Sequence, residues 1–256
     1  ILHYLLDPFL PCTILYFTYG IFNLYKDVPM RESTSKELSD ALRCILEHPE
    51  GACFIHYSCT DIYEYQHMWG PLQEENRDKT PPPRINAIAI HSLTNEETRS
   101  FGLDFYIRIM DLKPHEYVSR RDEFEAMMLK GFYSYIQTLD PEMLYMHWNM
   151  DGDVFGFDAI ARRYRVLGGV PVDFPKQHTL NLAAVIANIY PCQSRQRRLM
   201  PLIRANGLFT KSIIDGKNES TDDFVRLTES TIEKAKAIAK LFFLTARKKL
   251  RLAPKF

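Results

Sequence analysis

Hydrophobic and polar positions alternate with two different periods along the chain. Short runs rich in β-branched and aromatic residues predict four strands: "ACFIHYSC" (52–59), "INAIAIHSL" (85–93), "SFGLDFYI" (100–107) and "EMLYMHWN" (142–149). The polar stretch "TNEETR" (94–99) separates the second run from the third. This spacing predicts that the second and third strands form a hairpin.

Stripes of apolar residues at helical spacing occupy much of the remaining sequence. Thr34 and Glu37 have the spacing of a capping box and begin a predicted helix that ends near Pro49 and Gly51. Apolar residues three and four positions apart predict four further helices, at 120–140, 155–169, 178–190 and 226–250. Strands interspersed with helices indicate the α/β class.

The length and composition of the chain fit one main domain. A chain of 256 residues, of which 46% are hydrophobic, is long enough to bury a substantial core. We expect this domain to span residues 51–256, and residues 1–50 to form a strand-and-helix extension that packs on it. The first 25 residues are apolar, but Asp7, Pro8 and Pro11 interrupt them, so neither a membrane span nor a signal peptide is expected.

Charge is distributed unevenly, although the formal net charge is zero. Residues 195–256 contain 15 Lys and Arg against 6 Asp and Glu, which leaves 17 against 26 in the preceding part. A basic segment is typical of a surface that contacts phosphates, but it is also common on solvated helices that bind no nucleic acid.

The cysteines predict neither a zinc site nor a disulfide framework. The five cysteines are scattered and form no C-x-x-C pair. This usage is typical of a reducing compartment, so we expect a cytoplasmic protein.

The stretch "MLYMHWNMDGDVFGFDAIARRYRVLGG" (143–169) is the first candidate for chemistry. A predicted strand runs into Asn149, an acidic loop with glycines follows, and Asp158 lies in the first turn of a helix that carries Arg162 and Arg163. Ligands of open α/β sheets bind at such junctions between a strand and a helix. Asp151 and Asp153 lie in the same loop and are further candidates for metal binding.

The order of three strands, a helix, a strand and a helix resembles the ribonuclease H-like fold, and the local motifs resemble its DEDD 3′–5′ exonuclease branch. The resemblance covers roughly residues 51–244 and is strongest at Asn149, Phe157 and Asp158, where the family has an N-x-x-F-D type motif. It implies a mixed sheet flanked by helices and hydrolysis of phosphodiesters by two Mg²⁺ or Mn²⁺ ions.

Two other motifs of the family have lost their acidic residues in this chain. Where the family ends its first strand with Asp-x-Glu, this sequence has Ser58 and Thr60. In the last helix, Glu229 stands at the position of a His and Lys234 at the position of a metal-binding Asp. Hard cations need several oxygen ligands, and an ammonium supplies none. The resemblance therefore implies a pseudo-exonuclease that binds single-stranded DNA or RNA.

The resemblance and the charge pattern together define the predicted site. The catalytic positions are Asp158, Asn149 and Glu229, and Asp158, Asp151 and Asp153 are the predicted metal ligands. The predicted contacts to nucleic acid are Ser58, Thr60, Arg162, Arg163, Lys234, Arg197 and Arg198.

Two other functions remain open at this point. Catalysis with Mg²⁺ or Mn²⁺ could persist if acidic residues near strand ends, such as Asp61, Glu64 and Asp104, rebuild a cluster with Asp158. His56 and His147 lie near the ends of neighbouring predicted strands and could converge there. Alternatively, the domain is a protein-interaction scaffold, with residues 1–25 contacting a partner chain.

Overall fold

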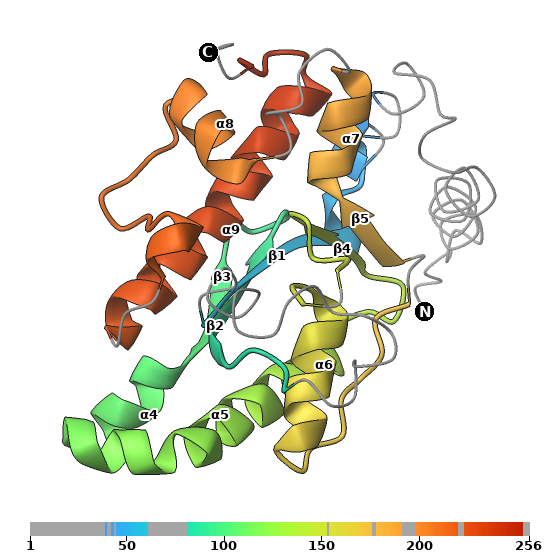
Figure 1. Ribbon diagram of the computed structural model, residues 1–256. Helices are drawn as coiled ribbons and strands as arrows, with labels where there is room; N and C mark the ends of the chain where they lie inside the picture. Colours follow the sequence, from blue (N-terminus) through green and yellow to red (C-terminus); the bar gives the residue numbers. More distant parts are fainter. Residues whose placement is uncertain are drawn as a thin grey trace, which may run out of the picture.

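The computed structural model describes residues 39, 42–43, 45–60, 81–152, 154–175, 178–190, 198–219 and 223–252 (Figure 1). They form a five-stranded mixed sheet with the strand order β3-β2-β1-β4-β5. The central strand, β1 (Ala52–Cys59), pairs antiparallel with β2 (Ile85–Ser92) and parallel with β4 (Leu144–His147). The outer strands are β3 (Thr98–Gly102), antiparallel to β2, and β5 (Thr179–Asn181), parallel to β4. The predicted α/β class is confirmed.

Helices cover both faces of this sheet, which gives three layers (Figure 1). On one face lie α4 (Leu103–Ile109), α5 (Pro114–Ile136) and α6 (Phe157–Val166), and on the other α7 (Leu182–Ile189), α8 (Leu199–Ala205) and α9 (Phe224–Ala246). In the described part of the chain, no helix is long and apolar enough to span a bilayer.

Each face of β1 contributes to a separate hydrophobic core. Ile55 and Tyr57 pack in the core beneath α5 and α6, whereas Phe54 packs in the core beneath α7, α8 and α9. Successive side chains of a strand point to opposite faces, so His56 and Ser58 point to the α9 side. All eight residues of β1 are buried, as expected for a strand with helices on both sides.

Tertiary contacts end β3 earlier than the sequence pattern predicts. The run over residues 100–107 alternates like a strand, but β3 ends at Gly102 and α4 begins at Leu103. A Cβ on Gly102 would lie 2.3 Å from both Asp104 Oδ1 and Thr228 Oγ1. Thr228 on α9 donates a 2.7 Å hydrogen bond to this Asp104 carboxylate, and Arg108 donates another at 3.0 Å. These bonds fix the first turn of α4 against α9.

The fifth strand was not predicted. Residues 178–190 were predicted to form one helix, but Thr179–Asn181 form β5 and the helix begins at Leu182. The Asn181 side chain caps α7 by accepting from the backbone N–H of Ala183 at 3.1 Å.

Only the end of the predicted N-terminal extension lies among the described residues. Residues 42–43 and 45–47 are helical, in agreement with the predicted helix. Leu42 and Ile45 join the core on the α9 side of the sheet. The boundary at residue 50 stays a prediction, and residues 1–38 lie outside the described part.

Candidate functional site at the carboxyl edge of the sheet

The carboxyl ends of three strands meet at one edge of the sheet. β1, β4 and β5 run in the same direction, so Ser58, His147 and Asn181 lie at or near this edge. Open α/β sheets bind their ligands outside the carboxyl ends of parallel strands. We call this region the carboxyl edge, and it contains residues from both faces of the sheet.

A buried ion pair lies at the carboxyl edge on the α9 side. The ammonium of Lys234, on α9, donates to Oε1 of Glu219, which follows the short 3-10 turn Gly216–Asn218. Ser58, near the end of β1, donates from Oγ to the other carboxylate oxygen, Oε2, at 3.1 Å. All three side chains belong to buried residues. The carboxylate therefore joins β1 to α9, and we call Ser58, Glu219 and Lys234 the Glu219 cluster.

His56 lies on the same face of β1 as Ser58, next to the Glu219 cluster. It is 7% exposed, and within the described part of the chain its Nδ1 atom has no hydrogen-bond partner. Burial lowers the pKa of His56 well below its usual value, and the positive charge of Lys234 lowers it further. The imidazole is therefore neutral near pH 7, and Lys234 supplies the positive charge at this site.

His147 faces the opposite side of the sheet, so the two histidines do not converge. In the parallel register His147 is the partner of Ile55, which faces α5, and its ring packs edge-on against Phe157 with centroids 5.3 Å apart. Its Nδ1 accepts a 3.0 Å hydrogen bond from the Met150 backbone N–H. Burial lowers the pKa of His147 to about 4. The suggested convergence of His56 and His147 is wrong, because the sheet register places them on different faces.

Asn149 belongs to a hydrogen-bond network between the ends of β4 and β5. Its backbone N–H donates to Asn181 Oδ1 at 3.2 Å, and its side-chain oxygen accepts from Asn181 Nδ2 at 3.3 Å. The same Nδ2 donates to Asp151 Oδ2 at 2.9 Å. Asn149 has φ 53°, a left-handed conformation that Asn adopts more readily than most residues. This network holds the polar edge of β4 against the cap of α7.

Asp158 is exposed in the first turn of α6, on the other face of the sheet from Lys234. The loop before it is fixed to β1, because the Gly156 N–H donates to Tyr57 Oη at 2.8 Å and Phe155 stacks on Tyr57 with centroids 4.4 Å apart. A Cβ on Gly156 would lie 2.3 Å from the Met150 carbonyl oxygen, so only glycine fits this turn. The helix that carries Asp158 therefore begins at a fixed point beside the carboxyl edge.

Arg163 points into the protein and not towards a ligand. Its guanidinium donates to Glu125 Oε1 at 2.9 Å, to Glu125 Oε2 at 2.7 Å and to Asp122 Oδ1 at 2.7 Å. Arg163 is 6% exposed and Glu125 is fully buried. The Glu125 carboxylate also accepts from the Ile85 backbone N–H at 2.7 Å. Arg163 thus joins α6 to α5 and β2, and its Nε and Nη2 groups donate to these carboxylates.

The other predicted site residues that the structure describes are exposed or partly exposed. Thr60 accepts from the Arg84 backbone N–H at 3.2 Å, and Glu229 Oε2 accepts from Ser212 Oγ at 3.5 Å. Glu229, Arg198 and Asp151 are exposed, Thr60 and Arg162 are partly exposed, and Asp153, Arg197, Asp61 and Glu64 lie outside the described residues.

The described residues contain no group of three or more His, Cys, Asp or Glu side chains that could hold a metal ion. The Asp104 carboxylate accepts hydrogen bonds from Thr228 and Arg108. The predicted metal ligands Asp158, Asp151 and Asp153 stay a prediction, because Asp153 is not among the described residues.

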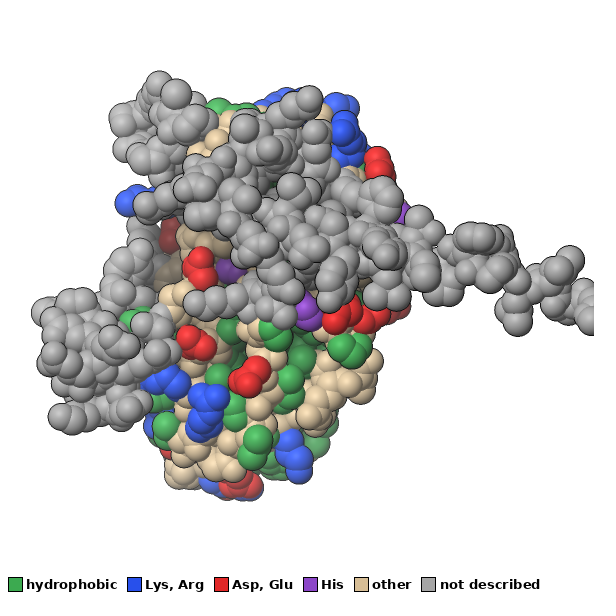
Figure 2. Space-filling model, turned by 90° about the vertical axis from the view of Figure 1, so that its right-hand side faces the viewer, with side chains coloured by type: hydrophobic (Ala, Val, Ile, Leu, Met, Phe, Trp, Pro, Cys, Tyr) green, Lys and Arg blue, Asp and Glu red, His purple; other side chains and the backbone are tan. Residues whose placement is uncertain are grey.

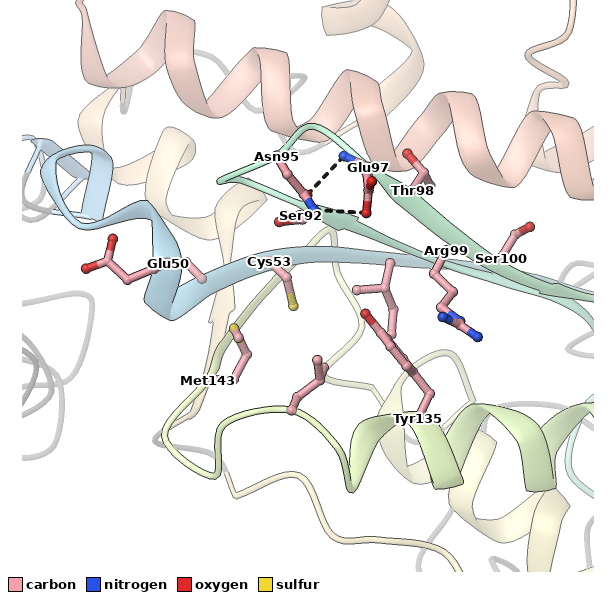
Figure 3. A pocket seen from close by; sticks show the side chains of 13 residues that line it. Glu50, Cys53, Ser92, Asn95, Glu97, Thr98, Arg99, Ser100, Tyr135 and Met143 are labelled. Carbon is pink, nitrogen blue, oxygen red and sulfur yellow. Dashed lines mark hydrogen bonds between the residues drawn. The ribbon is translucent and has the colours of Figure 1, made fainter.

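A pocket of about 520 Å³ opens at the opposite edge of the sheet, where β1 begins (Figure 3). Cys53 and Met143 line one part of it, and Arg99 lies over the ring of Tyr135, 4.9 Å from its centroid, in another part. Glu97 at the rim accepts from the Asn95 side chain within the β2–β3 turn. None of the predicted site residues lines this pocket.

The sequence analysis did not select Glu219, although it is the centre of the buried cluster. Glu219 lies in a polar, irregular segment, where an acidic residue is ordinarily solvated. The sequence position of its partner Lys234 did indicate a buried acidic residue. Lys234 falls among the apolar positions of the last helix, beside Ala235 and Ile238, and a lysine buried there requires an acidic partner.

Comparisons with known proteins give no relative: no protein-family model, no curated protein and no solved structure matches the chain.

Proposed function

We propose that this chain is a nucleic-acid-binding domain of the ribonuclease H-like, DEDD 3′–5′ exonuclease type, in which a buried ion pair replaces the two-metal site. In this proposal the domain binds single-stranded DNA or RNA and does not cleave it. The order of the elements supports the assignment. Three consecutive antiparallel strands are followed by helices, the parallel strand β4 and α6, which is the order that the sequence resemblance implies.

One observation carries the proposal: Ser58 and Lys234 contact the same carboxylate. The resemblance assigns these two residues, far apart in the sequence, to positions at which the family has metal-binding carboxylates. In the structure both donate to Glu219, one to each oxygen. Such a meeting is expected if the two positions belong to one ancestral site.

The charge of Lys234 opposes a divalent cation at the same place. Two unit charges 4 Å apart interact by about 4 kcal/mol at an effective dielectric constant of 20, so the ammonium repels a divalent cation beside it, while the Glu219 carboxylate offsets part of this repulsion. The single carboxylate of Glu219 is already used by Lys234 and Ser58. In this proposal the ammonium stands where the family has a metal ion, and its charge is balanced by Glu219.

A digestion assay tests this function. Single-stranded DNA and RNA oligomers labelled at the 5′ end are incubated with the protein in Mg²⁺, in Mn²⁺ and in a chelator, and both their length and their retention by the protein are measured. We expect retention without shortening, and equal retention with and without divalent metal.

Two variants sharpen this assay. Asp158→Asn removes the one acidic residue retained from the family's motifs, and Asp173→Asn removes an exposed Asp of the following loop as a matched control. If wild type and Asp173→Asn shorten the oligomer with metal and Asp158→Asn does not, the domain is an active exonuclease and the proposal is wrong. Absence of any retention at low salt would also reject it.

A further inference from the structure

We infer that the end of the molecule where α9 stops is a second contact surface for single-stranded nucleic acid, separate from the carboxyl edge. This inference rests on the proposed function and deepens it by naming the surface that supplies most of the affinity. The surface consists of six exposed basic residues: Arg204, Lys240, Arg247, Lys248, Lys249 and Arg251. We call it the terminal basic surface.

The described segments that form the terminal basic surface carry no negative charge of their own. Residues 198–211 and 234–252, which include α8 and the second half of α9, contain no Asp or Glu, and α7 carries no charged residue. Neighbouring acidic residues in the described part include Glu233, which pairs with Lys236 at 2.9 Å, and Glu47 in the helical residues that pack on the same core. Glu96 also lies nearby, since its charge acts on His91 together with that of Lys240. Figure 2 shows Lys and Arg side chains next to one another along the upper rim, the end where α9 stops in Figure 1.

Hydrogen bonds hold the basic segments together. Asn206, which caps α8, donates to the Arg251 carbonyl oxygen at 2.8 Å and accepts from the Arg251 backbone N–H at 2.9 Å. The chain after α9 is thereby fixed beside α8, so that Arg204 and Arg251 belong to one surface. Both bonds use the backbone of Arg251, which leaves its guanidinium able to contact a ligand.

Lys248 occupies a position at which glycine would be more favourable. Its φ is 55°, and the Lys249 N–H after it donates to the Leu244 carbonyl oxygen at 2.7 Å, so α9 ends with a left-handed residue. A non-glycine residue is strained in this conformation. Cations near a helix C-terminus offset part of this strain, but the effect acts within the last turn of one helix. It does not account for Lys240, which lies well before the last turn of α9.

Aromatic residues favour a single-stranded ligand over a duplex. Arg204 lies over the ring of Phe209, 4.3 Å from its centroid, and Phe209 is 42% exposed. Arg247 lies 5.7 Å from the centroid of Phe243. Each pair combines a guanidinium for a phosphate with a ring on which an unpaired base can stack. Stacked bases inside a duplex could not reach these rings.

The salt dependence of binding tests the surface. Each phosphate contact to a single strand contributes about −0.7 to the slope of log K against log[salt], so six contacts predict a slope of about −4. Affinity for a labelled 20-nucleotide oligo(dT) should then fall about 300-fold between 50 and 200 mM NaCl. The triple variant Arg247→Glu/Lys249→Glu/Arg251→Glu should lose at least half of this slope and bind more weakly at every salt concentration.

A control with the same change in net charge isolates the surface. Lys130, Arg165 and Arg226 are exposed on α5, α6 and the start of α9, and their reversal to Glu should leave most of the affinity. If both triple variants lose affinity equally, the terminal basic surface is wrong while the proposed function stands. If wild type binds no oligomer, both are rejected. Binding of wild type to phosphatidylserine vesicles but not to the oligomer would reassign the surface to membranes and overturn the inference.

Discussion

Replacing Lys234 by Met should destabilise the protein strongly, because it leaves a buried carboxylate without its cation. Lys234 and Glu219 are 4% and 8% exposed, and Ser58 Oγ donates the second side-chain hydrogen bond to that carboxylate. Removing one partner of a buried ion pair costs about 3–5 kcal/mol. Met retains most of the aliphatic length of Lys, so the loss comes from the charge and not from a cavity.

Urea unfolding measures this cost. With an m-value of about 3 kcal/mol/M, a loss of 3–5 kcal/mol lowers the midpoint by about 1–1.7 M. The double variant Lys234→Met/Glu219→Gln should recover much of the loss, since it removes both charges together. Lys236→Met is the matched control: its partially exposed pair with Glu233 should contribute less than about 1 kcal/mol.

The double-mutant cycle also shows which result would contradict the buried Lys234–Glu219 pair. If Lys234→Met lowers the stability by no more than Lys236→Met, and the effects of Lys234→Met and Glu219→Gln simply add, the two side chains do not form a buried pair in solution. Lys234 would then not occupy the metal position as an ammonium paired with Glu219.

Three further predictions concern the surroundings of the site. Gly156→Ala should destabilise the fold by about 3 kcal/mol in thermal unfolding, because its Cβ would overlap a backbone carbonyl oxygen. The control Gly51→Ala should be close to neutral, because a Cβ at Gly51 would have no neighbouring atom within 4 Å. Arg163→Met should cost about 3–5 kcal/mol in urea unfolding by leaving Glu125 buried and unpaired, and a loss under 1 kcal/mol would contradict the buried pair. His147 has a folded pKa of about 4, below the ordinary 6.5, so the unfolded chain binds its proton more tightly. Stability should fall by up to about 3 kcal/mol as the pH drops from 6.5 to 4, and a His147→Gln variant should show that much less pH dependence.

Local pattern was enough to predict the central strands. β1 and β2 are continuous apolar runs between turn signals, and their predicted ranges agree with the structure to within one residue. β5 has only three residues and shares Asn181 with the cap of α7, so no periodic signal separates the strand from the helix. β3 was predicted too long because the hydrogen bonds of Asp104 come from α9, far away in the sequence.

The candidate site was predictable only in part, because sequence spacing says little about which face a side chain occupies. Ser58 and Lys234 were selected through the family resemblance, and the structure shows that both contact Glu219, which was missed. Arg163 was selected through the same resemblance, but its guanidinium pairs with the buried Glu125. Whether a basic side chain contacts a ligand or pairs with a buried carboxylate depends on its tertiary contacts.

Crystals soaked in millimolar Mn²⁺ and measured at the manganese absorption edge would test the central claim directly. If Lys234 stands in the place of the catalytic cations, the anomalous map should show no peak within the usual ligand distance of about 2.0–2.6 Å from the carboxylate of Glu219 or Asp158. The density should instead show the Lys234 ammonium in contact with Glu219. A manganese peak coordinated by either carboxylate, with Lys234 turned away from it, would contradict the account.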